Sequence, residues 1–312
     1  MNRSKHISIA SHALGALAAL GSAFLWALAA ILFARLGKQM SALSMNIGKG
    51  LLALVVMGVL LLSTGVEFGD TRGMALLAIS GIIGIALGDT LYFLTLIRLG
   101  SRLTLLLGSL IPVTTAIIAA VFLKENISAL AWAGVALTIF GVTYVMWERR
   151  TPEKMTDSHR DNRQLRYRWM QGIGLGLIFV IANALSIIFS KLAVAQIPAM
   201  DATFIRQLWA IFAMAFWGTV TAQLVPWLRP LANPRLLKPL VIAAFIGAFL
   251  GTWLSIVALK YTYVTVAVVL NSTSPLFILP MAVWVLKEEV SLRSMVGAVI
   301  AVMGIGVYFF SL

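Results

Sequence analysis

Three charged side chains lie inside otherwise apolar stretches of this sequence: Asp89, Lys49 and Arg206. A carboxylate in apolar surroundings is costly when ionised, so Asp89 is a candidate to bind a proton or another coupling ion. If Lys49 lies close to it, the two would instead form a fixed ion pair. Lys49 and Arg206 are candidates for binding a carboxylate or phosphate, or for gating. The alternatives are a packing hydrogen bond for Asp89 and snorkelling of both cations.

Neutral polar residues and prolines occur at a similar depth in other apolar stretches. A proline inside a helix frees a carbonyl, which then needs a partner from a neighbour or from a lined cavity. Spacing places Asn271, Ser274 and Pro275 on one helical face, and Asn183, Ser186 and Ser190 on another. Hydrogen bonding and packing between helices are the alternative for each of these positions. The sequence predicts a cavity lined by Trp26, Tyr92, Ser109, Pro112, Asn183, Ser186, Trp253, Asn271, Ser274 and Pro275.

The composition is that of a membrane protein. Of 312 residues, 61% are apolar and 11% are charged, and the mean hydropathy is +0.97. In a soluble domain about 45–50% of the residues are apolar and about 25% are charged. The net charge of +13 lies mostly in short stretches between apolar runs, which favours topology signalling and contact with lipid headgroups over nucleic-acid binding. There is no cysteine, and the histidines lie outside the apolar runs, so we expect no metal and no cofactor.

Apolar stretches of about 17–25 residues predict membrane-spanning helices. The first is too long for the apolar core of a signal peptide, so it is counted as a helix. An even number of spans places both termini on one side. The ten predicted spans are 13–35, 42–63, 73–97, 102–123, 128–147, 169–190, 202–225, 239–259, 264–286 and 292–311.

The chain divides into two similar halves, 1–147 and 169–312, joined by a charged linker at 148–168. A shift of 163 residues aligns Gly88 with Gly251, Ser109 with Ser272 and Pro112 with Pro275, and likewise the Lys-Glu pairs at 124–125 and 287–288. A shift of 157 places Lys49 on Arg206. Because each unit has five spans, the second must enter the membrane from the opposite side. The predicted fold is therefore all-α, with ten helices in two inverted five-helix repeats.

These repeats resemble the EamA-type branch of the drug/metabolite transporter superfamily over nearly the whole chain. The best segments are 88–141 and 251–304, each with its central proline. Lys49 departs from the arginine usual in the second helix, whereas Arg206 keeps it. The resemblance implies export or exchange of small metabolites such as amino acids through a central cavity. It leaves the substrate open.

The leading hypothesis is a secondary transporter that exports or exchanges a small polar or amphiphilic metabolite by alternating access. A flippase for lipids or lipid-linked sugars is the alternative. Of other classes, an intramembrane enzyme is disfavoured because membrane depth offers no His, no Cys and one acid. A non-transporting scaffold is disfavoured by the cavity-like polar residues at the repeat interface. The expected partners are the substrate, membrane lipids and, as an open alternative, a proton or another coupling ion. The sequence leaves open whether the protein is a monomer or a homodimer.

The expected location is the inner membrane of the cell. Most Lys and Arg residues flank the side opposite the termini, so the charge distribution predicts external termini. The family resemblance instead implies cytoplasmic ones.

Overall fold

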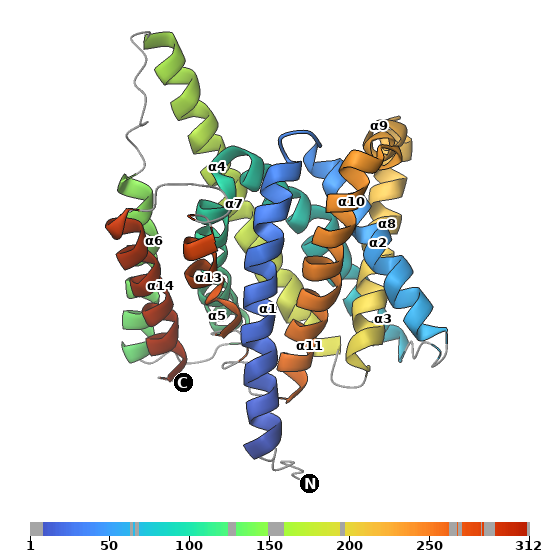
Figure 1. Cartoon of the computed structure of the whole chain (residues 1–312). Helices are drawn as coiled ribbons and strands as arrows, with labels where there is room; N and C mark the ends of the chain where they lie inside the picture. Colours follow the sequence, from blue (N-terminus) through green and yellow to red (C-terminus); the bar gives the residue numbers. More distant parts are fainter. Residues whose placement is uncertain are drawn as a thin grey trace.

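The computed structural model describes residues 9–62, 65, 69–123, 129–148, 159–193, 197–261, 267, 270–281, 283 and 291–310. Every regular element within these ranges is a helix, and the longer helices run side by side along one axis (Figure 1). The start of α1 and the end of α14 lie at the same end of this bundle. Bonds from the Ser44 and Gly73 amides to the side chains of Ser41 and Asp70 cap the first turns of α2 and α3.

The two halves have matching series of elements. The first comprises α1 (Ile9–Leu36), α2 (Ala42–Leu61), α3 (Thr71–Ser80), the π-helix η1 (Gly81–Asp89), α4 (Thr90–Gly108), α5 (Ile111–Leu123) and α6 (Ala129–Glu148). The second comprises α7 (His159–Ala193), α8 (Ala199–Val220), α9 (Leu224–Leu228), the 3-10 helix η2 (Arg229–Ala232), α10 (Pro234–Ala243), the π-helix η3 (Ala244–Gly251), α11 (Thr252–Tyr261), α13 (Ser274–Met281) and α14 (Leu292–Phe310).

Helical segments long and apolar enough to cross a bilayer number five in the described chain: Ala13–Leu36, Ala42–Leu61, Thr71–Gly108, which is kinked at Gly100, Arg166–Ser190 and Pro234–Ala258. Two shorter apolar helices, Trp132–Gly141 and Leu292–Val307, fall below that length. The predicted number of ten spans therefore stays a prediction, while the multi-pass, all-helical class is established.

Two predicted spans are interrupted helices. The span at 102–123 follows a chain reversal at Gly100 (φ 79°) and is broken by a turn at Ser109–Leu110, just before α5. In the second half a turn at Ser272–Thr273 precedes α13. These turns occupy equivalent repeat positions, and each lies just before a proline that cannot donate a helical backbone hydrogen bond. These turns interrupt the predicted spans at 102–123 and 264–286 near the prolines that the sequence placed inside them.

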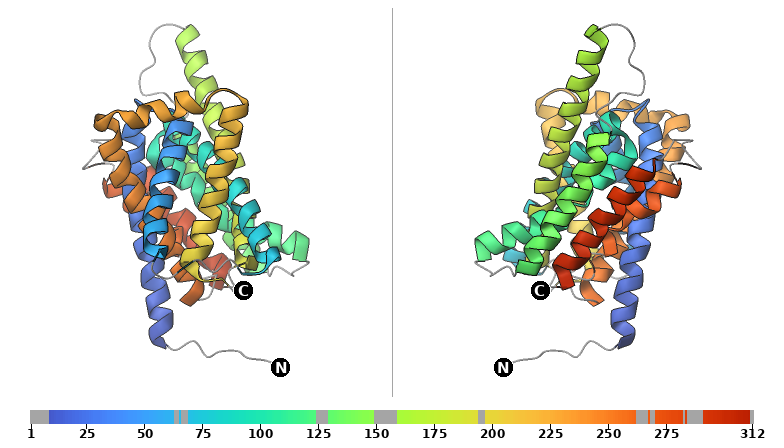
Figure 2. Two further views of the ribbon diagram at one scale, coloured as in Figure 1. Left: turned by 90° about the vertical axis from the view of Figure 1, so that its right-hand side faces the viewer. Right: turned by 90° about the vertical axis from the view of Figure 1, so that its left-hand side faces the viewer.

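The helix α7 begins ten residues before the predicted span at 169. Residues 159–168 of the predicted linker are helical, and this end of α7 projects beyond the rest of the bundle (Figure 2). The segment was read as a linker because it is polar, but Arg, Gln and Leu are good helix formers whatever their polarity. The Lys-Glu pairs used to align the repeats lie outside the described residues.

The first helix of each half packs mainly against the other half. The first helix of each half packs on the third and fourth spans of the other: α1 contacts η3, α11 and α13, and α7 contacts η1, α4 and α5. The last helices, α6 and α14, pack on each other at glycines. A Cβ on Gly141 would lie 2.7 Å from the Gly297 oxygen, and one on Gly304 would lie 2.8 Å from the Gly134 oxygen. These contacts are related by the same 163-residue shift that aligns the sequences.

We expect Gly304→Ala to destabilise the protein, because its new methyl group would collide with the α6 backbone at Thr138 and Gly134. Overpacking of this kind costs about 1–3 kcal/mol. Gly306→Ala is the matched control, since a Cβ there meets no atom within 4 Å. The thermal midpoint of purified protein in detergent should fall by several degrees for Gly304→Ala and stay within about one degree for Gly306→Ala. Equal midpoints would contradict the close contact between α6 and α14.

Candidate functional site

A cavity of about 290 Å³ lies between the two halves, near the small end of the range for small-molecule sites. Its walls come from α1, α2, η1, α4 and α5 of the first half, and from α7, α8, η3, α11 and the segment before α13 of the second. Of the residues that the sequence predicted for the site, the lining contains Trp26, Lys49, Asp89, Tyr92, Ser109, Pro112, Asn183, Arg206, Asn271 and Ser274.

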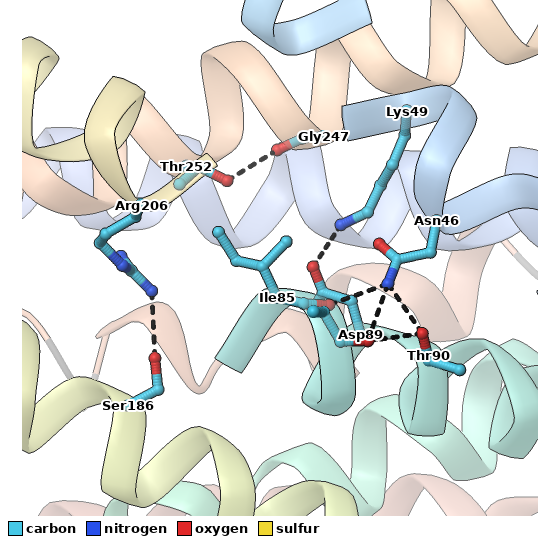
Figure 3. A network of polar contacts seen from close by, with 10 residues as sticks. Asn46, Lys49, Ile85, Asp89, Thr90, Ser186, Arg206, Gly247 and Thr252 are labelled. Carbon is cyan, nitrogen blue, oxygen red and sulfur yellow. Dashed lines mark hydrogen bonds and ion pairs between the residues drawn. The ribbon is translucent and has the colours of Figure 1, made fainter. Parts of the chain in front are cut away.

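The cavity contains an ion pair between Lys49 on α2 and Asp89 at the end of η1 (Figure 3). The Lys49 and Asp89 side chains are 11% and 24% exposed, and the lysine nitrogen also lies 5.5 Å from the centre of the Phe93 ring. This is the arrangement for which the sequence predicted a fixed ion pair rather than an isolated carboxylate. The lysine therefore does not reach out to the membrane interface.

Asn46 binds the backbone around Asp89, and the sequence analysis did not single it out. Its amide nitrogen donates to the Ile85 oxygen at 2.8 Å and to the Thr90 hydroxyl at 2.9 Å (Figure 3). Ile85 lies four residues before Asp89, and Thr90 directly follows it. A π-helix leaves carbonyls without their usual α-helical donors, and an amide side chain from a neighbouring helix can supply them. The available signal was its position one turn before Lys49 in an otherwise apolar helix.

Arg206 on α8 lines the cavity and is anchored by hydroxyl groups. Its Nη2 donates to the Ser186 hydroxyl at 3.2 Å. Ser186 in turn contacts the Ser80 hydroxyl at 2.8 Å, and Ser80 contacts Ser190 at 2.7 Å. The prediction that Ser186 lines the cavity was wrong, because this residue is buried between α3 and α7. Its hydroxyl instead holds Arg206 in place.

Glycines bring the π-helices into contact with the first helix of the opposite half. A Cβ on Gly88 would lie 2.8 Å from the Asn183 amide nitrogen, and one on Gly251 would lie 2.8 Å from Trp26 Cδ1. These glycines are repeat partners, so Trp26 and Asn183 occupy related places on either side of the cavity. A larger residue at either glycine would collide with these cavity-lining side chains.

The interrupted helices supply the remaining polar lining. The Asn271 amide donates to the Ser255 hydroxyl at 2.9 Å, and the Ser274 hydroxyl donates to the Asn271 carbonyl at 3.0 Å. That carbonyl is the one that the Pro275 nitrogen cannot reach in a regular helix, because proline has no N–H. Pro275 lies in α13, but its side chain is outside the described set. In the first half, the Ser109 hydroxyl donates to the Leu106 carbonyl at 2.6 Å.

Aromatic rings cover part of the cavity wall. The Tyr92 ring lies with its centre 5.4 Å from that of Phe179 and 5.3 Å from that of Phe93. Trp253 does not belong to this wall, so that prediction was wrong. It lines a separate apolar pocket with Leu17. The physical reason is the helical turn of about 100° per residue, which places Thr252 and Ser255 toward the central cavity and Trp253 away from it.

Comparison with known proteins identifies the family. The model of the EamA-like transporter family matches residues 13–147 and 170–310, so the chain belongs to that family, as the sequence indicated. A solved structure titled "Crystal structure of protein" is similar in fold, with a TM-score of 0.64 and 15% identity over 96% of this chain and 98% of the other. No match was found among curated proteins. The protein is thus a multi-pass membrane protein of a transporter family.

We predict that Lys49 and Asp89 are energetically coupled. Asp89→Asn and Lys49→Met should each lower the thermal midpoint, because each leaves a charge without its partner in an apolar environment. The cost should be about 2 kcal/mol, below that of a fully buried pair, because the Asp89 carboxylate keeps some exposure to the cavity. The double variant should lose less than the sum of the two single variants. Additive losses in this cycle would argue against a functional ion pair.

Proposed function

We propose that this protein is a secondary transporter that exports or exchanges a small polar or amphiphilic, amino-acid-like metabolite. The observation that carries the proposal is the central cavity, which both halves line with a mixture of charged, amide, hydroxyl and aromatic groups. Polar groups in a membrane protein are costly unless they line a cavity or contact each other. Such a lining fits a solute with both polar and apolar parts better than it fits a purely structural role.

Alternating access is the proposed mechanism, with the two halves inverted relative to each other. Support comes from the packing of each half's first helix on the π-helix of the other half, with α1 on η3 and α7 on η1. Because both contacts border the cavity, a rocking motion of one half against the other would open it to one side at a time. The turns at Ser109–Leu110 and Ser272–Thr273 are further support, since broken helices border the substrate sites of many transporters.

The charged residues of the cavity are proposed to act in coupling or gating. A change in the Lys49–Asp89 pair would alter the charge of the cavity, either by protonation of the carboxylate or by competition from a bound ion. Arg206 is placed to act on an anionic group of the substrate. A transport role rather than an enzymatic one fits the family, which is one of transporters.

Transport should be measured with purified protein in liposomes, using a panel of labelled amino acids and related metabolites, with and without a pH gradient. We expect saturable flux that unlabelled substrate on the opposite side accelerates. Ile187→Trp, which fills the cavity, should lower this flux at least about tenfold. Ile181→Trp is the matched control on the same helix; Ile181 is exposed outside the cavity and the variant should retain the flux.

A flippase would give a different result in the same vesicles. Labelled phospholipid would then change leaflet in a protein-dependent way, and Ile187→Trp would block that movement instead of metabolite flux. Absence of any metabolite flux above that of protein-free vesicles would refute the proposed function.

The protein is proposed to lie in the inner membrane with both termini on its external side, as the charge distribution predicts. Single cysteines test it cleanly, because the native chain has none. Arg72 is exposed at the beginning of α3, and Lys38 is exposed in the turn after α1, at the opposite end of the bundle. On intact cells, a thiol reagent that cannot cross the membrane should label Arg72→Cys but not Lys38→Cys. The reverse pattern would support cytoplasmic termini.

A further inference from the structure

The two repeats differ at the position of the cavity carboxylate. Lys49 and Arg206 are equivalent residues on the second helix of each half, and Asp89 and Thr252 are equivalent residues after the last glycine of each π-helix. All four line the same cavity. The first repeat therefore supplies a cation with its own carboxylate, and the second supplies a cation with a neutral hydroxyl in the corresponding place.

No carboxylate of the described residues lies within ion-pair distance of Arg206, although Asp89 is near enough for its charge to act on the guanidinium. Thr252 does not compensate, because its hydroxyl donates to the Gly247 carbonyl at 3.3 Å (Figure 3). The Nε of Arg206 is buried and has no hydrogen-bond partner in the described part of the chain. The described lining thus contains two cations, Lys49 and Arg206, against the single carboxylate of Asp89.

A guanidinium in this position favours an anion. Its planar donors match a carboxylate in two parallel hydrogen bonds, and burial away from water strengthens that attraction. A second donor lies beside it: Gln207 is 4% exposed, lines the cavity, and has a buried Nε2 without a partner in the described residues. Two adjacent side chains on α8 therefore hold donors that nothing described in the protein uses.

We propose that Arg206, with Gln207, binds a carboxylate of the transported molecule, which takes the role that Asp89 has beside Lys49. This inference rests on the proposed transport function and narrows it. The substrate class is a small carboxylic acid or amino acid whose apolar part faces the aromatic wall formed by Trp26, Tyr92 and Phe179. The ion pair on the other side of the cavity leaves Asp89 committed to Lys49, so Arg206 is the cation available to the substrate.

The sharpest test restores the missing carboxylate. Thr252→Asp places a second carboxylate in the cavity that Arg206 lines, where it should compete with the substrate, while Thr252→Asn introduces nearly the same shape without the charge. The probes are L-leucine, 4-methylpentanoate, L-leucinamide and isopentylamine, which share one apolar group and differ in their charged groups. Binding is measured as the ligand-induced rise in the thermal midpoint of purified protein, and flux is measured in liposomes.

We expect the wild type to bind leucine and 4-methylpentanoate, and to bind leucinamide and isopentylamine at least about tenfold more weakly. Thr252→Asp should weaken binding of both carboxylates at least about tenfold more than Thr252→Asn does. If Thr252→Asp does not fold, Arg206→Gln takes its place, and should abolish the preference for leucine over leucinamide.

Several outcomes would overturn the assignment. Equal losses in Thr252→Asp and Thr252→Asn would show a steric effect rather than a charge effect. Undiminished carboxylate binding in Thr252→Asp, or a preference for leucine that survives in Arg206→Gln, would show that the carboxylate binds elsewhere. No midpoint shift with either carboxylate would also refute it. An absence of flux in liposomes would refute the transport function alone. The ligand-induced shifts in thermal midpoint would still test whether Arg206 binds the carboxylate.

Discussion

The structure depends on the close approach of each half's first helix to the glycine-rich π-helix of the other half. Gly88 against Asn183 and Gly251 against Trp26 leave no room for a side chain at either glycine. In a membrane the attraction between helices comes largely from such close packing rather than from exclusion of water. The same two contacts border the central cavity, so the surface that joins the halves also shapes the candidate binding site.

Satisfaction of polar groups explains the residues around these contacts. The π-helical turns change the backbone hydrogen-bond pattern, and Asn46 donates to the Ile85 carbonyl within one of them. The prolines remove donors, and in the second half the Ser274 hydroxyl supplies a replacement at Asn271. Because apolar surroundings offer no water, each irregularity in the backbone requires a polar neighbour. Part of the polar character of the cavity wall therefore arises because its irregular helices need polar partners.

The repeat is symmetric in packing and asymmetric in charge. The α6–α14 contact uses glycines at equivalent positions, whereas the cations on α2 and α8 have different surroundings. Lys49 has Asp89 as its partner, but Arg206 has the Ser186 hydroxyl. The two halves therefore share a packing scheme but differ in the charged groups that they contribute to the cavity.

The sequence by itself determined the class of the protein, the division into halves and the charged residues that line the cavity, but not the buried Arg102 and Asp201. Charged residues and mid-helix prolines are conspicuous in apolar stretches, so Asp89, Lys49, Arg206 and Pro112 could be selected without a structure. The sequence did not determine the pairing of Lys49 with Asp89, because the two residues lie on different helices. Nor did it determine that Trp253 faces away from the cavity or that Ser186 anchors Arg206. Those facts depend on the rotation of each helix about its axis and on the π-helical turns, which only the packed halves fix.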